Sequence, residues 1–436
     1  MLFIGRVLTV VTVLALLGIH NAQAIVINVP NDFLTIQEAI NAAAAAGDVV
    51  EVEPGTYTGP LNRDLDFMGK AIVLRGIGGA AVTTIDCQEL SRGFNFHSGE
   101  TNAAVVEDFT IMNGRRPGDH KGAGILCVNG SSPTIRDCVI TRNEASNGSG
   151  MYCDGSSPVV MNSTFAFNGL GGVTIGWGAG INCSNGSNPS ITGCTFSRNL
   201  VFIGGGAGIA CNKSSPTITE CNFRDNSTEQ GAGIAILFGS SPAISDCIFE
   251  RNFGENGGDA LYALESTCVA SNCLLVENRG GGVIVDVGSN VTLSNSTIAL
   301  SEYFLGGSVA VYVRDLAQSQ GIAILDRVII AFGDGVAVSC ESGGEATLTC
   351  CDVFGNADGD WTGCIAGQLG ANGNFSLDPL FCSLEMRDFR LNATSPCLPG
   401  NHPQGAACGL IGVYGSGCAT AVAPTTWGAI KAHYGR

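Results

Sequence analysis

The sequence has few basic residues, because 21 Lys and Arg stand against 38 Asp and Glu and give a formal net charge of −17. An acidic chain repels phosphate backbones, so nucleic acid is excluded as a partner. Histidine is also scarce: the five histidines are scattered, and no C-x-x-C pair or His-x-His cluster accompanies the cysteines. The sequence therefore predicts no metal centre built from Cys and His.

Long apolar runs are missing after residue 24, so we expect no membrane span in the mature chain. The first residues, MLFIGRVLTVVTVLALLGIHNAQA, carry one positive charge, an apolar run over 7–19 and a small-x-small ending. This pattern is typical of a secretory signal peptide over 1–24, cleaved before Ile25. The alternative is an uncleaved membrane anchor, but the run is short for a span and the cleavage site is good. We expect a secreted or cell-surface protein.

What the sequence does have is an internal repeat. One phrase, GAGINCSNGSNPSITGCTFSRN, returns as GAGIACNKSSPTITECNFRDN. An asparagine closes each unit, and successive closing asparagines are about 26 residues apart. The series is Asn143, Asn168, Asn199, Asn226, Asn252 and Asn278. A proline in the SSP-like turn moves with it. Two markers that move together show that the unit is real, and it is clearest over 122–282.

Within each unit, apolar residues alternate over short runs bounded by Gly, Ser, Pro and Asn, which predicts short strands. A unit of this length cannot bury its apolar face alone, but stacked units form a continuous core. The sequence therefore predicts an all-β fold, a parallel β-helix in one domain over 25–420. Stacked asparagines would then hold a strained turn conformation and bond to one another. Two cysteine columns are predicted as structural positions for small side chains.

A resemblance supports this fold. The GAGI phrases followed by F-x-x-N are similar to the repeats of chlamydial polymorphic outer-membrane proteins, and more broadly to the right-handed β-helix proteins of the pectin-lyase-like superfamily. The opening VPNDFLTIQEAINAAAAAGDVVEVEPGTYTG also resembles the start of that superfamily. The resemblance covers nearly all of 25–418 and implies a right-handed solenoid with a capping helix near 35–46. It leaves function open, because the superfamily includes lyases, hydrolases, epimerases and adhesins.

Two readings of the function follow. Hydrolases of this superfamily carry N-T-D, D-D, G-H-G and R-I-K motifs and its alginate epimerases D-P-H-D, and none is present. We therefore expect a non-catalytic, adhesin-like scaffold that binds a polysaccharide, or a cell-surface glycan or protein. The alternative is a polysaccharide lyase or glycoside hydrolase with an unrecognised site. Glu220 and Asp246 should lie on adjacent coils and could bind Ca²⁺, although solvated surface carboxylates explain them as well.

Insertions after the closing asparagines should collect on one face of the solenoid, where binding surfaces often form. Trp177 and Phe202 are the aromatic candidates for a sugar platform there, against the plainer reading that they cover the core under a loop.

The carboxy-terminal part is different in chemistry. Eight cysteines lie within 340–418, which predicts a disulfide-rich cap in a secreted chain. Connectivity does not follow from sequence, and Cys397 with Cys408 is the pairing we favour. Residues 421–436 form a tail that can hold a short helix.

Overall fold

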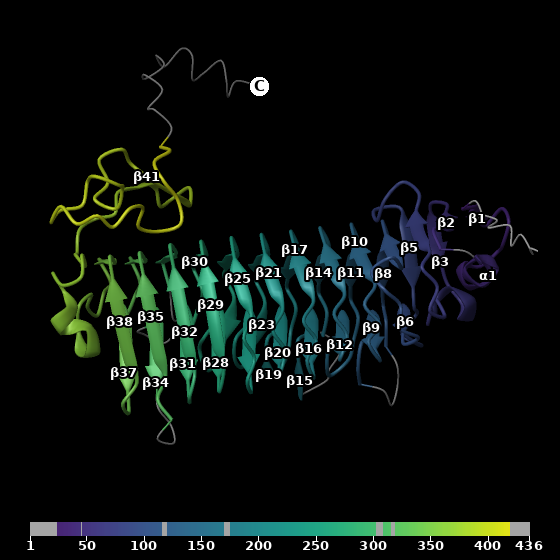
Figure 1. Ribbon diagram of the computed structural model, residues 1–436, viewed down its shortest axis with the longest axis horizontal. Coiled ribbons are helices and arrows are strands. Elements are labelled where there is room, and N and C mark those ends of the chain that lie inside the picture. The colour runs from purple at the N-terminus through teal and green to yellow at the C-terminus, as the bar shows by residue number, and fades with distance from the viewer. Residues whose placement is uncertain are drawn as a thin grey trace, which may run out of the picture.

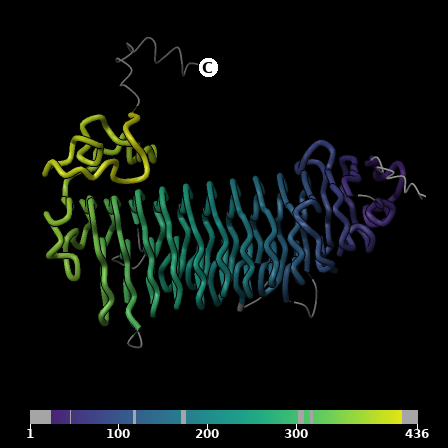
Figure 2. The backbone as a smooth tube through the Cα atoms, in the orientation of Figure 1, coloured from purple at the N-terminus to yellow at the C-terminus, as the bar shows by residue number. Residues whose placement is uncertain are grey.

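The computed structural model describes residues 24–44, 46–115, 120–169, 175–301, 308–314 and 319–418. The predicted signal peptide, except residue 24, and the predicted tail helix lie outside this part of the chain. The described strands wind into a long stack of coils (Figure 1), and the continuous rise of the backbone from coil to coil is seen in Figure 2. Most coils give one strand to each of three parallel sheets, so the predicted β-helix is confirmed.

Sheets I, II and III hold 13, 12 and 10 of the described strands. Sheet I contains β1 (Val26–Val29), β2 (Val49–Val52), β4 (Val73–Gly76), β7 (Val105–Glu107), β10 (Thr134–Arg136), β13 (Val159–Met161), β17 (Ser190–Thr192), β21 (Thr217–Thr219), β25 (Ala243–Ser245), β29 (Thr267–Ser271), β32 (Asn290–Ser294), β35 (Ile322–Asp326) and β38 (Glu345–Thr349). Sheet II contains β3 (Gly55–Tyr57), β5 (Thr83–Asp86), β8 (Thr110–Met112), β11 (Val139–Thr141), β14 (Thr164–Ala166), β18 (Thr195–Ser197), β22 (Asn222–Arg224), β26 (Ile248–Glu250), β30 (Leu274–Val276), β33 (Thr297–Ala299), β36 (Ile329–Ala331) and β39 (Asp352–Phe354). Sheet III contains β6 (Phe94–Phe96), β9 (Ile125–Val128), β12 (Met151–Asp154), β16 (Ile181–Ser184), β20 (Ile209–Asn212), β24 (Ile234–Leu237), β28 (Leu261–Leu264), β31 (Val283–Asp286), β34 (Val311–Arg314) and β37 (Val338–Glu341).

Between sheets II and III the chain makes an arc of variable length. Some of the arcs pair with one another as short strands. These are β15 (Ile175–Trp177) with β19 (Ile203–Gly205), and β23 (Ser227–Thr228) with β27 (Phe253–Gly254). The arcs therefore stack along the rod beside sheet III.

The asparagine ladder lies at the turn where each coil leaves sheet II. The Asn226 amide nitrogen donates to the side-chain oxygen of Asn252 at 3.0 Å and to the Phe196 carbonyl at 2.9 Å. The Asn226 side-chain oxygen accepts the backbone and side-chain N–H of Asn199. The same pattern runs from Asn143 to Asn278. Each buried asparagine thus satisfies the turn of the neighbouring coil.

The strained backbone conformation does not fall on these asparagines, which corrects the expectation from sequence. The positive φ belongs to the residue immediately before each one. These residues are Arg142, Phe167, Arg198, Asp225, Arg251 and Glu277, with φ between 51° and 57°. The asparagine is needed for its side-chain hydrogen bonds, four in the inner members of the series and three in Asn143 and Asn278. The turn accepts different side chains at the strained position because they point to the outside.

The core is built from columns of like side chains. The rings of Phe165, Phe196, Phe223 and Phe249 stack with centroids 5.1, 4.9 and 4.8 Å apart. Cys127, Cys153, Cys183 and Cys211 occupy one register in sheet III. All 13 free cysteines of the described residues are buried. In the second column, each thiol donates to the carbonyl two residues earlier, as Cys221 does to Thr219, and Ser163 repeats that bond with its hydroxyl.

The amino-terminal end of the core is closed by helix α1 (Ile36–Ala42), which buries Ile36, Ala39 and Ile40 and lies within the predicted range. A 3-10 turn, η1 (Pro60–Asn62), packs beside it, where the Asn62 side chain accepts the N–H of Ile36. None of the helices in the described ranges is long and apolar enough to cross a membrane.

The carboxy-terminal part closes the other end and then folds back along the rod, as the yellow segment in Figure 1 shows. The 3-10 helix η2 (Gly363–Gln368) follows the last coil, and β40 (Phe381–Ser383) pairs antiparallel with β41 (Asp388–Leu391). Three disulfides tie this region together. They are Cys340–Cys364, Cys350–Cys408 and Cys382–Cys418.

The favoured pairing of Cys397 with Cys408 is therefore wrong. Cys408 pairs with Cys350, which is adjacent to the core residue Cys351 in the last coil. Cys397 stays a thiol and donates to the carboxylate of buried Asp352 at 3.2 Å. Sequence spacing favoured the nearer pair, whereas the cap is bonded back to the solenoid.

Candidate functional site

The outer face of sheet III is where the solenoid carries buried polar and aromatic side chains outside its main core. Along each strand, side chains alternate between the interior and the exterior. In β28 the exterior residue Tyr262 leaves only 3% of its surface exposed, and in β31 Ile284 leaves 4%. Both belong to a second apolar cluster with Ala235 and Leu237, separate from the core. An exterior position buried this deeply must be covered by something, and the arcs provide that cover.

Trp177, a predicted sugar platform, is part of this cover. It packs against the cluster of Ala235 and Tyr262, and its arc pairs with the next arc at Gly205. A Cβ at Gly205 would lie 2.8 Å from the Trp177 ring, so only glycine leaves the ring its place. Phe202 lies at the start of the adjacent arc and is 52% exposed. The two predicted aromatics therefore differ: Trp177 covers the outer face of sheet III and Phe202 faces solvent.

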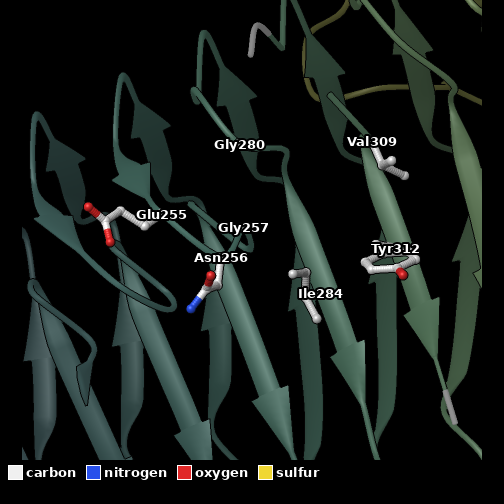
Figure 3. Close-up of a pocket in the computed structure, with 7 residues that line it drawn as sticks. All are labelled: Glu255, Asn256, Gly257, Gly280, Ile284, Val309 and Tyr312. Atoms are coloured by element: carbon white, nitrogen blue, oxygen red, sulfur yellow. The ribbon is translucent and has the colours of Figure 1, made fainter. Parts of the chain in front are cut away.

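The cover ends near β34, and a cavity of about 220 Å³ opens there. It is lined by Glu255, Asn256, Gly257, Gly280, Ile284, Val309 and Tyr312. In Figure 3, Ile284 and Tyr312 stand on neighbouring strands, while Glu255 and Asn256 come from the arc beside them. The cavity thus has an apolar and aromatic floor and one polar wall.

A buried carboxylate shapes this wall. Asp259 accepts the backbone N–H of Gly254 at 2.7 Å and that of Gly280 on the next arc. Burial raises the pKa of Asp259 well above its ordinary value, against the opposing effect of these two hydrogen bonds. A Cβ at either glycine would lie within 2.9 Å of the carboxylate. Asp259 therefore joins two successive arcs, and both glycines are required for the join.

Beside the cavity, four side chains of sheet III form a connected polar cluster. The Tyr262 hydroxyl donates to Oδ2 of Asp286 at 3.0 Å, and the Arg314 guanidinium lies 2.7 Å from the same oxygen. Arg314 also lies over the ring of Tyr312, with 5.6 Å between its central carbon and the ring centroid. Burial raises the pKa of Tyr262 above its ordinary value, and Asp286 raises it further. Both tyrosines stay neutral at physiological pH, since burial and a hydrogen bond with Glu341 raise the pKa of Tyr312 to about 12.

This arrangement is suited to holding a hydroxylated ligand. Tyr312 offers a half-buried aromatic face, and the Arg314 guanidinium, which Asp286 holds in a fixed position, supplies hydrogen-bond donors. Asp286 is committed to Tyr262, Arg314 and the N–H of Val287. A carboxylate with these partners is poorly placed to transfer protons. Across the described residues, no group of three or more His, Cys, Asp and Glu could hold a metal ion.

The predicted carboxylates Glu220 and Asp246 lie elsewhere. Both are exposed on the ridge of turns between sheets I and II, with φ of 54° and 56°. Asp246 bonds to Asn272 of the next coil at 3.2 Å and lines a cavity under the carboxy-terminal cap. The ridge and sheet III are different parts of the coil, so these two carboxylates do not join the site at Tyr312.

Sequence reasoning missed the cluster of Tyr262, Asp286, Tyr312 and Arg314. The sequence does contain a pattern by which these strands can be aligned. A small residue, Ala or Gly, directly precedes each of the strands Leu261–Leu264, Val283–Asp286 and Val311–Arg314, at the same position of the coil. The second and fourth residues of these strands face outward. Aligning them would have placed Tyr262, Ile284 and Tyr312 in one outward row and Asp286 beside Arg314.

A family model described as "Right handed beta helix region" matches residues 92–263 and 207–375, which together span more than half of the chain. No curated protein matches the sequence. Among solved structures, the chain is similar to the catalytic domain of a GH87 alpha-1,3-glucanase in complex with nigerose, with 13% identity and a TM-score of 0.48. That match covers 72% of this chain and 66% of the glucanase domain, just under two thirds of its length.

Two further structures are similar at the same low level. A pectate lyase shares 13% identity at a TM-score of 0.44, over 88% of this chain and 91% of the lyase. The A-module of a mannuronan C-5 epimerase from Azotobacter vinelandii shares 16% identity at a TM-score of 0.41, over 79% of this chain and 94% of the module. Identities and TM-scores of this size do not bear on activity.

Proposed function

Since this chain belongs to the right-handed β-helix family, we propose that it is a non-catalytic scaffold, secreted or held at the cell surface, that binds a neutral glycan on the outer face of sheet III. The observation that carries the proposal is the cavity at Tyr312, beside the Asp286–Arg314 pair. Sugar rings pack their C–H faces on aromatic side chains and bond through hydroxyls to charged groups. Both kinds of partner are held here in one fixed arrangement.

The charges around the cavity favour a neutral glycan over a polyuronate. Glu255 lines the cavity, Asp286 belongs to the adjacent cluster, and Glu341 bonds to Tyr312. The positive charge of Arg314 is paired with Asp286. The whole chain is also strongly acidic. A carboxylated polymer would approach like charges, whereas a neutral chain gains the hydrogen bonds without repulsion.

The predicted signal peptide and the likeness of the repeats to those of chlamydial polymorphic outer-membrane proteins support an adhesin-like role outside the cell. In this role the glycan belongs to a surface that the protein attaches to. The repeated coils supply a rigid rod, and the binding cluster lies toward its carboxy-terminal half.

The test is binding and turnover on one set of probes. Purified protein is incubated with cellohexaose, laminarihexaose, maltohexaose and hexagalacturonate, with and without Ca²⁺. We expect retention of at least one neutral hexamer and no change in chain length. New reducing or unsaturated ends would contradict the non-catalytic scaffold, and binding only of hexagalacturonate would contradict a neutral ligand.

A substitution at Tyr312 tests whether the glycan binds in the cavity. Tyr312→Ala removes the aromatic face and should weaken binding by about tenfold or more, as loss of a central aromatic contact does. Phe238→Ala is the matched control, because Phe238 is a 40% exposed aromatic at the end of β24 and does not line the cavity. Equal loss in both variants, or no loss in either, would place the ligand elsewhere.

A further inference from the structure

The carboxy-terminal cap packs on the solenoid and leaves a slot between its segment 408–414 and the ridge of turns. Phe389 of the cap packs with Leu274 and Val276 on the outer face of sheet II. Arg387 reaches Glu250 and Glu277, more than 100 residues earlier in the chain. Between the cap and the ridge of turns that joins sheets I and II lie two adjoining cavities of about 310 and 360 Å³. They share Asn272 and Val413, so they form one elongated slot.

The floor of the slot is a row of polar side chains, one from each successive coil. The row consists of Asp246, Asn272, Asn295 and Arg327. Each has a positive φ, between 45° and 56°, which is the tight turn of its coil. Coils are about 4.8 Å apart, so these groups form a regular series of hydrogen-bonding positions.

The groups of the floor are fixed in pairs. Asn272 donates to Oδ1 of Asp246 at 3.2 Å, and Nε of Arg327 donates to the side-chain oxygen of Asn295 at 2.7 Å. Arg327 is also paired with Asp326. Among the described residues, no hydrogen-bond partner takes the second oxygen of Asp246 or the amide nitrogen of Asn295. One acceptor and one donor therefore remain available to a ligand in positions that their neighbours hold.

The roof is the cap segment 408–414, which presents Leu410, Val413 and Tyr414. Burial raises the pKa of Tyr414, so its hydroxyl stays protonated and the side chain is neutral. The disulfide of Cys408 anchors one end of this segment, and Gly412 donates its N–H to the Arg327 carbonyl at 2.9 Å. Gly412 has φ of 89°, and a Cβ there would lie 2.5 Å from Ile329. The roof is thus held against the solenoid at Cys408 and at Gly412.

A polar floor opposite an aromatic and aliphatic roof matches the two surfaces of a pyranose ring, its hydroxyl edge and its C–H face. The negative charge of Asp246 disfavours a uronate, and the Arg327 charge is balanced by Asp326. We propose that the slot between the cap and the ridge is a second binding site, which takes a neutral pyranose residue. The site stands on its own residues and does not depend on glycan binding at sheet III.

The experiment titrates the full-length mature protein with methyl glucoside, methyl galactoside and N-acetylglucosamine by saturation-transfer NMR and calorimetry. Asn272→Gly removes a floor side chain, and glycine adopts positive φ without strain. Glu220→Gly is the matched control, because Glu220 is exposed at the same turn position but does not line the slot. We expect at least one pyranoside to bind, an affinity loss of about tenfold in Asn272→Gly, and a change below about twofold in Glu220→Gly.

Tyr312→Ala separates this site from the one at sheet III. Binding of the pyranoside at the slot should be unchanged in that variant, whereas hexamer binding should weaken by about tenfold or more. If no pyranoside binds, or if Asn272→Gly binds as well as the wild type while its melting temperature is unchanged, the slot is not a ligand site. Loss of pyranoside binding in Tyr312→Ala alone would also overturn the proposal.

Discussion

At the scale of single residues, the ladder asparagines carry more hydrogen bonds than other side chains of the turns. Asn226 is fully buried and makes four, two as donor and two as acceptor. Removing one such side chain leaves buried groups of two neighbouring coils without partners, and each unsatisfied group costs about 1–3 kcal/mol. The turn therefore depends on asparagine at this position and tolerates varied residues just before it.

Asn226→Ala should lower stability by about 3–5 kcal/mol, because its four partners stay buried. The measurement is the melting temperature by calorimetry together with a urea titration. Asn188→Ala serves as the control, since Asn188 is exposed and its side chain accepts one hydrogen bond, from the Ser215 N–H of the neighbouring coil, while its backbone bond to Ser157 is kept in the variant. A loss no greater than that of the control would mean that the ladder does not support the coils.

A second prediction at this scale concerns Asp352 and the dependence of stability on pH. Burial raises its pKa from 3.8 to about 7, although the N–H of Leu377 and the thiol of Cys397 donate to it. Between these two values the folded chain keeps a proton that the unfolded chain has released, so stability falls as pH rises. The change between pH 5 and pH 8 should be on the order of a few kcal/mol.

Asp352→Asn should flatten this pH dependence, because the amide does not titrate. Unfolding midpoints at pH 5, 6, 7 and 8 give the measurement, and Asn188→Ala, which removes no titratable group, should keep the wild-type slope. If Asp352→Asn and the wild type lose stability in parallel above pH 5, the group responsible is another one.

At the scale of elements, the match between glycine and phenylalanine decides how closely coils stack. Gly208 lies beside the Phe223 ring, and a Cβ there would be 2.4 Å from the Gly233 carbonyl oxygen. Two coils later, the glycine column of sheet III continues with Ala260, which lies next to Gly233. In the same coil, the phenylalanine column of sheet II continues with Leu275, which pairs with Phe249. A larger residue in one column is thus accompanied by a smaller one in the other.

Gly208→Ala should therefore destabilise the rod by about 1–3 kcal/mol through overpacking. Adding Phe223→Leu to this variant should recover part of the loss, which calorimetry of the single and double variants measures. Gly367→Ala is the control, because no atom lies within 4 Å of a Cβ there. Additive losses in the double variant would show that the two columns are not coupled.

The sequence predicts those elements that belong to the repeat and misses the features that depart from it. Strand positions, the helix at 36–42 and the stacking of the Asn and Cys columns follow from alternation and period, because every coil repeats the same local chemistry. The outward cluster of Tyr262 and Asp286 departs from that repeat and was missed. The pairing of Cys350 with Cys408 depends on how the cap folds back, and local spacing holds no information about that contact.

At the scale of the whole molecule, the cap is a separate clamp on the rod. The Cys350–Cys408 disulfide closes 58 residues, and Arg387 adds ion pairs to Glu250 and Glu277 that are exposed and weak. Replacing both cysteines by serine should therefore destabilise the cap by about 2–4 kcal/mol while the central coils stay intact. Hydrogen exchange should rise in 397–414 and stay unchanged in 122–282, and a general increase along the rod would contradict a separate clamp.

The sheet III site and the slot under the cap lie on different sides of the coil, so a footprint tells them apart. Hydrogen exchange of the wild-type protein with and without cellohexaose, laminarihexaose and maltohexaose tests the proposed function most directly. We predict added protection in 255–264, 280–286 and 309–314 for at least one of these neutral hexamers. Protection confined to sheets I and II, or none with any hexamer, would contradict the assignment of the glycan to the outer face of sheet III.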